Sequence, residues 1–203
     1  ARGLVAAPGL VDMHTHMREP GFEAKETIAT GTAAAARGGV TSILAMANTL
    51  PVIDSPERVA MLYERAKRDA RVRLYTVGAV SKGMQGKEIT DVEGLLRAGA
   101  AALSDDGVPL MNAQIMRRAL QRMKPSGLPI LSHSEDGDLV RTGVMNEGAL
   151  SRKLGYEGRP AVAEELLLVR DGMLAADTGG YVHICHVSTK GSVAYIRQMK
   201  AAG

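Results

Sequence analysis

The fold is decided near the N-terminus, by the stretch GLVDMHTHMREPGFEAKETIATGTAAAARGGVTSILAMA, residues 9–47. Two short apolar runs, at 9–16 and 41–47, flank an alanine-rich amphipathic segment at about 25–37. Short apolar runs separated by a helical pattern are typical of a strand, a helix and a second strand parallel to the first. The stretch therefore predicts one βαβ unit, and the same alternation continues along the chain.

The alternation predicts six strands, each followed by a helix. The expected strands are 9–16, 41–47, 73–80, 101–105, 128–133 and 181–188, and the expected helices are about 25–37, 56–69, 91–98, 112–123, 161–177 and 190–201. Ser55 followed by Pro56 is typical of a helix start, because proline at the first helical position lacks a donor that would be unpaired anyway. Thr90 is expected to cap the next helix and Gly99 to end it.

The number of units bears on the fold class. Six consecutive βα units favour an α/β fold of the (β/α)8 TIM-barrel type, with about six of the eight units present, over an open doubly wound sheet. A complete barrel needs about 250 residues, whereas this chain has 203 and does not begin with Met. We therefore expect residues 1–203 to form a partial barrel (strands 1–6), with strands 7–8 absent. The segment 134–160, rich in glycine and charge, is expected to be a surface excursion.

Composition excludes several classes of protein. The chain is 45% hydrophobic and 23% charged, and its 25 basic and 22 acidic residues are interspersed, so no nucleic-acid or membrane-surface patch is expected. No apolar run approaches the roughly 18 residues of a membrane span. A single cysteine, Cys185, excludes an internal disulfide and fits a reducing, cytoplasmic location.

Chemically useful side chains gather at the expected strand ends. His14 and His16 are two residues apart on the first strand and share a face with Asp12, while His133 ends the fifth strand. The sixth strand carries His186 near its C-terminal end. Barrels place their active sites at this rim, and neutral imidazoles with a carboxylate suit Zn²⁺.

The pair Asp105 and Asp106 ends the fourth strand, where a carboxylate can bridge two metals or simply form a turn. An isolated histidine at a strand end is usually structural, but four of the five histidines share one rim here. The fifth, His183, has the opposite parity to His186, so it is expected to face the helix layer. Cys185 shares the face of His183 and is expected to be a packing residue.

Several motifs carry a family resemblance. Residues 8–51, LSDDG (103–107), SHSEDGDL (132–139), NEGALSRKLG (146–155) and HICHVSTKGS (183–192) follow one another in the order and spacing of class I dihydroorotases, in the amidohydrolase superfamily. The resemblance covers essentially the whole chain. It implies a TIM-type barrel with two zinc ions per site.

The resemblance also implies a division of the metal ligands. His14 and His16 match the ligands of the more buried zinc, and His133 and His186 match those of the second zinc. Asp106 matches the carboxylate that bridges the two ions.

Two further positions match substrate-binding residues of the family. Arg18 and Asn48 correspond to the residues that hold the substrate's carboxylate, a role that suits the planar fork of arginine and the amide donor of asparagine. The implied reaction is the reversible hydrolysis of (S)-dihydroorotate to N-carbamoyl-L-aspartate in de novo pyrimidine biosynthesis.

Other parts of the family's machinery are expected outside this chain. In relatives, the aspartate that transfers the proton (the general acid/base) follows the eighth strand, which places it beyond residue 203, and the small flanking β-domain is likewise expected to be absent. The 203-residue chain is accordingly expected to bind metal poorly and to turn over little. The small-molecule substrate is the expected partner, with a homodimer at full length and aspartate transcarbamoylase as the candidate protein partner.

Two other functions stay open. Another cyclic amidohydrolase, such as a hydantoinase or allantoinase, typically bridges its metals with a carboxylated lysine on the fourth strand, where this chain has Asp105 and Asp106. A non-catalytic pseudo-dihydroorotase that scaffolds aspartate transcarbamoylase tends to lose metal ligands, whereas five candidate ligands are present here.

Overall fold

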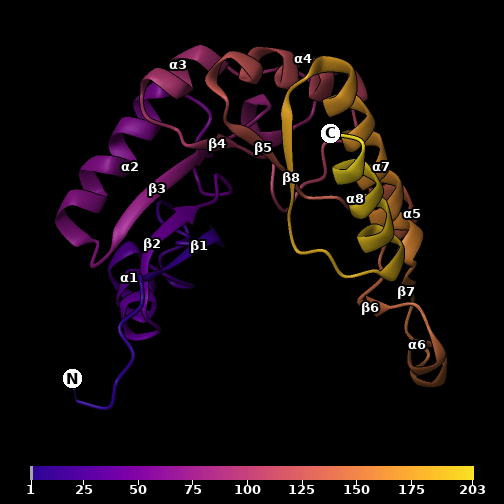
Figure 1. Cartoon of the computed structure of the whole chain (residues 1–203), viewed down its shortest axis with the longest axis horizontal. Helices are drawn as coiled ribbons and strands as arrows, with labels where there is room; N and C mark the ends of the chain where they lie inside the picture. The colour runs from indigo at the N-terminus through magenta and orange to yellow at the C-terminus, as the bar shows by residue number, and fades with distance from the viewer. Residues whose placement is uncertain (1) are drawn as a thin grey trace.

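A computed structural model describes residues 2–203 and shows a six-stranded parallel sheet curved into an arch (Figure 1). Its strand order is β1-β2-β3-β4-β5-β8, so the strands of this sheet lie side by side in the order of the chain. The strands are β1 (Leu10–Thr15), β2 (Val40–Ala45), β3 (Arg73–Gly78), β4 (Ala102–Leu103), β5 (Pro129–Ser132) and β8 (Tyr181–Ile184). The expected parallel α/β half-barrel is confirmed.

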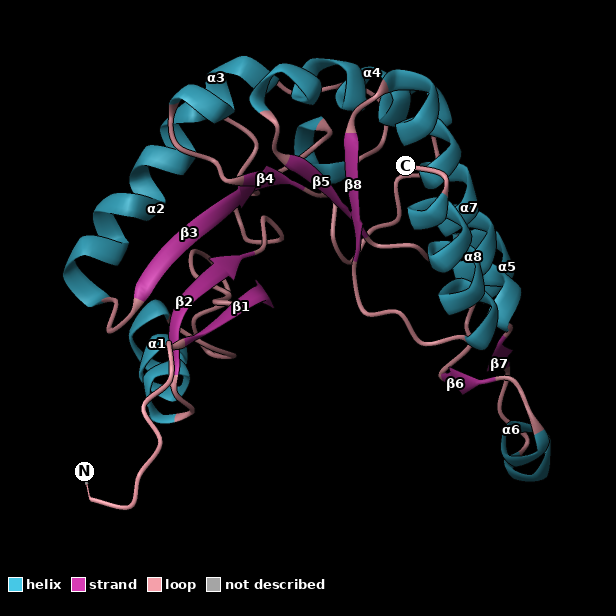
Figure 2. Ribbon diagram, viewed as in Figure 1, coloured by secondary structure: helices cyan, strands magenta, loops and turns pink. Residues whose placement is uncertain are grey.

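Helices cover the convex side of the arch, and the strands line its concave side (Figure 2). The main helices are α1 (Ile28–Arg37), α2 (Pro56–Asp69), α3 (Val92–Arg97), α4 (Ala113–Met123), α7 (Ala161–Thr178) and α8 (Lys190–Ala201), with short 3₁₀ turns at Lys82–Met84 and Lys124–Ser126. Each strand is thus linked to the next by a crossover that contains a helix, as parallel pairing requires.

One predicted helix cap is wrong. Thr90 does not cap α3, because its hydroxyl donates to the backbone carbonyls of Ala79 (2.8 Å) and Val80 (3.1 Å). Asp91 takes the capping position instead and accepts a hydrogen bond from the backbone N–H of Gly94 at 3.1 Å. Thr90 therefore ties the start of this helix to the chain that follows β3.

Two apolar layers hold the arch together. The larger lies between the sheet and the helices and includes Ile43, Leu103 and Ile130 from the strands. The smaller comes entirely from the strands and the residues that directly follow them; it consists of Leu44, Met46, Val77, Ala102, Leu131 and Cys185. Because side chains alternate along a strand, the smaller layer lies on the concave face of the sheet.

His183 faces this concave side, and its expected orientation toward the helices is wrong. In the register between β5 and β8, Ile130 pairs with Val182 and Leu131 pairs with His183. Ile130 and Val182 pack in the layer beneath the helices, so alternation places His183 with Leu131 on the opposite face. The prediction assumed that side chains alternate from His183 as far as His186. That assumption fails because β8 ends at Ile184 and His186 has left-handed backbone geometry, with φ of 36°.

The expected surface excursion at 134–160 contains short elements of its own. They are α5 (Gly137–Val140), β6 (Met145–Asn146), α6 (Ala149–Leu154) and β7 (Gly158–Arg159). Strands β6 and β7 pair with each other in parallel and form a separate two-stranded sheet. The excursion projects from the end of the arch where α7 and α8 lie (Figure 1).

The half-barrel has two edges, β1 and β8. Leu10 and Val11 on β1 and Tyr181 on β8 are exposed. Among residues 2–203, no helix combines the length and the apolar character needed to cross a membrane.

A matched pair of leucines tests the larger apolar layer. Leu120→Ala, in α4 where Leu120 is fully buried, should lower the free energy of unfolding by about 2–5 kcal/mol, because it leaves a cavity. Leu166→Ala, on α7 where Leu166 is 51% exposed, should change it by less than about 0.5 kcal/mol. Denaturant unfolding of the two purified variants gives both values, and equal losses would contradict the assignment of the layer.

Candidate metal centre

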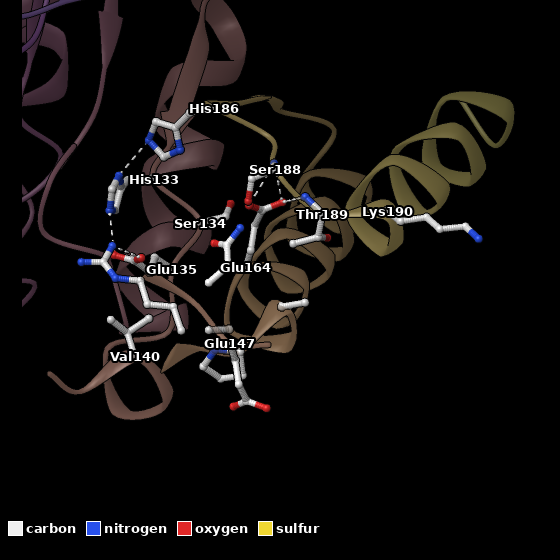
Figure 3. Close-up of a pocket in the computed structure, with 15 residues that line it drawn as sticks. His133, Ser134, Glu135, Val140, Glu147, Glu164, His186, Ser188, Thr189 and Lys190 are labelled. Carbon is white, nitrogen blue, oxygen red and sulfur yellow. Dashed lines mark hydrogen bonds and ion pairs between the residues drawn. The ribbon is translucent and has the colours of Figure 1, made fainter. Parts of the chain in front are cut away.

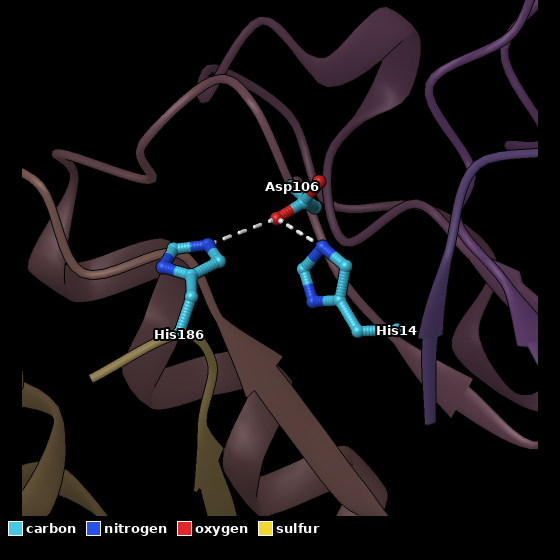
Figure 4. A group of neighbouring side chains, drawn as sticks. All are labelled: His14, Asp106 and His186. Carbon is cyan, nitrogen blue, oxygen red and sulfur yellow. Dashed lines mark ion pairs between the residues drawn. The ribbon is translucent and has the colours of Figure 1, made fainter. Parts of the chain in front are cut away.

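The structure brings together the five residues that the sequence analysis singled out as metal ligands. His14 and His16 lie at the end of β1, Asp106 follows β4, His133 directly follows β5, and His186 lies two residues beyond β8. Side chains from the two edges of the sheet come together here, since the rings of His14 and His186 are 5.2 Å apart between centroids. Figure 4 shows Asp106 between these two imidazoles.

Asp106 is the centre of this cluster and is 3% exposed. Its Oδ1 lies 3.3 Å from His14 Nε2, 3.3 Å from His133 Nδ1 and 3.5 Å from His186 Nε2. Its Oδ2 lies 3.4 Å from His16 Nε2. Three imidazoles therefore face one carboxylate oxygen and the fourth faces the other. The division of the histidines into two zinc-binding pairs stays a prediction.

The cluster fits a divalent cation. Asp106 Oδ1 is buried and makes no hydrogen bond although three imidazole nitrogens surround it. Where the facing imidazole nitrogens carry no proton, they add only further lone pairs and leave this buried carboxylate oxygen uncompensated, which is costly. The ligand atoms of His14, Asp106 and His186 all lie within 4.8 Å of one another. A cation among them would satisfy all of these atoms, and nitrogen and oxygen donors are those that zinc takes.

The charge states in the cluster follow from its geometry. Burial by itself would raise the pKa of the Asp106 carboxyl, but contacts with His133, His14 and His186 outweigh burial and hold the pKa far below its usual range. The contact with Asp106 raises the pKa of His186 above its ordinary value. Burial lowers the pKa of His16, despite its hydrogen bond to Asn48. Asp106 is therefore a carboxylate at neutral pH.

Asp105, the other member of the carboxylate pair, makes hydrogen bonds that stabilise the local structure. Its buried Oδ1 accepts hydrogen bonds from the backbone N–H groups of Val80 (2.8 Å) and Ser81 (3.1 Å), and its Oδ2 accepts one from the Ser81 hydroxyl. Burial raises the pKa of Asp105. These bonds fix the loop that carries Asp106 to the chain that follows β3. Asp105 thus holds the turn after β4, and the role of Asp106 as a metal ligand stays a prediction.

Arg18 and Asn48 lie beside the cluster. Asn48 Oδ1 is 3.0 Å from His16 Nδ1, so this side chain contacts an imidazole as well as facing the site. Arg18 has φ of 57°, in the left-handed region that non-glycine residues seldom adopt. His186 shares this feature, and such strain is often found at functional sites. The substrate-binding roles of Arg18 and Asn48 stay predictions.

A cavity of about 520 Å³ adjoins the cluster, with His133 and His186 in its wall (Figure 3). Glu135 also lines it and places Oε2 3.5 Å from His133 Nε2. This carboxylate is not among the residues predicted from the sequence, although its position two residues after His133 in SHSED was a usable signal. Cys185 takes no part in this wall; burial raises the pKa of its thiol to about 12, which agrees with a packing role.

A parallel half-barrel with histidines and a carboxylate gathered at the C-terminal ends of its strands defines the amidohydrolase class. Residues 3–192 match the family described as "Dihydro-orotase-like". The chain belongs to the dihydro-orotase-like family of amidohydrolases.

Named relatives agree with this family. The chain is 51% identical over 199 residues to a dihydroorotase from Endomicrobium trichonymphae, which covers 98% of this chain and 47% of that protein. It is 51% identical over 203 residues to a dihydroorotase from Pelotomaculum thermopropionicum, and the match covers 100% of this chain and 47% of that protein. The chain thus spans about half the length of the curated relatives it matches.

Solved structures agree with the fold. An L-hydantoinase from Arthrobacter aurescens superposes with a TM-score of 0.79 at 20% identity, covering 97% of this chain and 45% of that one. A dihydropyrimidinase from Brevibacillus agri NCHU1002 superposes with a TM-score of 0.75 at 26% identity, covering 97% and 44%.

Zinc binding should release protons near neutral pH. Because the pKa of His186 is raised, this ring is protonated over a wider pH range than a free imidazole, and it must lose that proton to bind a metal. The affinity for zinc should therefore fall as the pH is lowered from about 8 to about 6. Calorimetry in buffers of different ionisation enthalpy measures the protons released.

His183→Gln is the matched control for this titration, because His183 lies on β8 outside the cluster. It should leave both the proton release and the affinity unchanged. A binding heat that is independent of the buffer would contradict the prediction.

Proposed function

We propose that this chain carries the zinc-binding part of a dihydroorotase active site, for the reversible hydrolysis of (S)-dihydroorotate to N-carbamoyl-L-aspartate. The observation that supports it most is the buried, unpaired Oδ1 of Asp106 among three imidazole nitrogens. Identity of 51% to named dihydroorotases, along essentially the whole chain, supports the choice of substrate.

The residues of the cluster would hold the metal. His14, His16, His133 and His186 present nitrogen donors and Asp106 presents both carboxylate oxygens, so this set suffices for two zinc ions with Asp106 between them. Bound zinc supplies a Lewis acid for the ring carbonyl and lowers the pKa of water.

Arg18 and Asn48 would bind the substrate. The guanidinium of Arg18 offers two parallel donors to the substrate's carboxylate. Asn48 uses Oδ1 on His16, which leaves its Nδ2 group able to donate to the same carboxylate. Together these side chains would orient the ring with its scissile amide toward Asp106.

The proton acceptor and the rest of the barrel complete the proposal. We place the general acid/base aspartate, strands 7–8 and the small β-domain outside residues 1–203. The sheet has two unpaired edges, β1 and β8, which expose Leu10, Val11 and Tyr181. These edges support the proposal that further strands pair with them. A homodimer and an association with aspartate transcarbamoylase stay predictions.

A hydantoinase-like activity is the second candidate, because the superposed solved structures are hydantoinases and dihydropyrimidinases. The residues after β4 argue against it. They offer Asp105 and Asp106, and the nearest lysines in the sequence are Lys87 and Lys124. The retention of all five candidate ligands likewise argues against a non-catalytic scaffold.

A substrate panel on the full-length, zinc-loaded protein tests the proposed function. We expect hydrolysis of dihydroorotate and cyclisation of N-carbamoyl-L-aspartate, with little turnover of hydantoin or allantoin. Stoichiometric zinc together with hydantoin hydrolysis alone would favour the second candidate. Purification without zinc and without any activity would favour a scaffold.

Arg18→Met tests the substrate-binding role. Loss of a charge-assisted interaction worth about 1.5–3 kcal/mol should lower kcat/KM for dihydroorotate by roughly 10- to 100-fold, with an unchanged zinc content. Arg37→Met, an exposed arginine in the last turn of α1, is the matched control and should behave as the wild type. Equal kinetics for the two variants would remove Arg18 from the site.

A further inference from the structure

The two ring nitrogens of His133 have different surroundings. Nδ1 faces the cluster, 3.3 Å from Asp106 Oδ1 and 2.9 Å from His186 Nε2. Nε2 points away from the cluster, toward Glu135 Oε2 at 3.5 Å. Figure 3 shows His133 between His186 and Glu135. A metal in the cluster would therefore meet Nδ1, which requires the tautomer with the proton on Nε2.

Glu135 is itself held by the far end of the surface excursion. Its Oε1 accepts a hydrogen bond from Arg159 Nη1 at 2.9 Å, and Arg159 belongs to β7. Arg159 Nε also donates to the carbonyl of Gly143 at 2.7 Å. A continuous series of contacts thus runs from the backbone of the excursion through Arg159 and Glu135 to His133.

The backbone on either side of His133 is fixed separately. The hydroxyl of Ser132 donates to the buried Asp171 at 2.6 Å and contacts the Ser134 hydroxyl at 3.0 Å. These contacts hold the main chain of this segment but do not touch the imidazole. Rotation of the His133 ring therefore depends on the groups at its two nitrogens.

We propose that Glu135, held by Arg159, is the positioning residue for His133. Its carboxylate faces the protonated Nε2, which fixes the tautomer and leaves the Nδ1 lone pair directed into the cluster. A carboxylate behind a ligating imidazole also makes the ring a stronger donor. This inference rests on the proposed metal centre and deepens it, because it adds a residue that acts on the metal only through His133.

The other imidazoles of the cluster lack such a partner. His16 contacts the neutral amide of Asn48, and His14 Nδ1 is buried without a hydrogen bond. In the described part of the chain, Glu135 is the one carboxylate besides Asp106 in ion-pair contact with any of the four imidazoles. The effect of Glu135 should accordingly be specific to His133.

The test uses the full-length protein and measures zinc affinity by competition with a chromophoric chelator at constant pH. Glu135→Ala should weaken zinc binding by about 10- to 100-fold, the usual effect of removing a partner of this kind. Glu135→Gln should fall between it and the wild type, because its amide oxygen can still accept a hydrogen bond from Nε2–H but carries no charge. The visible spectrum of the Co²⁺-loaded protein should change in Glu135→Ala.

Glu147→Ala is the matched control. Glu147 lines the same cavity but is exposed and carries no side-chain contact to the cluster, so zinc affinity should stay within about twofold of the wild type. Thermal unfolding of the metal-free proteins separates positioning from a structural role. A loss of stability in Glu135→Ala with unchanged zinc affinity and Co²⁺ spectrum would overturn the proposal.

Arg159→Met provides the second variant. Because Arg159 acts through Glu135, its substitution should weaken zinc binding in the wild-type background and have no further effect in Glu135→Ala. If the losses of zinc affinity in Arg159→Met and Glu135→Ala added fully in the double variant, Arg159 would not act through Glu135. If the wild type itself binds no zinc, the proposed metal centre is wrong and this inference is wrong with it. If the wild type binds zinc and the variants bind it equally tightly, only this inference is wrong.

Discussion

The burial of one carboxylate, Asp106, at the meeting point of four imidazoles is the constraint on which the rest of this structure depends. A carboxylate with an unpaired oxygen is costly away from water, so each element that carries a cluster residue must hold it firmly. Strand β4 has only two residues, so the loop that follows it needs other support. The hydrogen bonds to Asp105 hold that loop in place. The hydrogen bond from Ser132 to the buried Asp171 holds the segment after β5 in place.

This constraint also explains how the two apolar layers are used. The layer beneath the helices fixes the order and curvature of the sheet, and the concave layer carries strand-end residues such as Met46 and Cys185 close to the cluster. Curvature is what brings His14 on the first strand near His186 after the last. A flat sheet with the same strand order would separate these two side chains by the width of six strands.

Much of this could be predicted from the sequence, because its signals are local. The helix expected at 56–69 is α2 as observed, since Ser55, Pro56 and the apolar period mark it without help from other segments. The convergence of the histidines followed from parallel strands alone. The face of His183 did not follow, because parity was counted through residues that have already left the strand. Thr90 was misassigned as a cap because its partners lie in the preceding loop, and Glu135 was missed because its partner Arg159 is 24 residues further along the chain.

The position of the cluster gives a bound cation a mechanical role as well as a chemical one. His14 and His186 come from the opposite edges of the open sheet, so an ion held by both would act as a clip across the mouth of the arch. Crosslinks that close long stretches of chain remove the most freedom from the unfolded state. The stretch between these two histidines includes every strand of the sheet except the first residues of β1. The ion of the proposed reaction would therefore also hold the half-barrel at its curvature.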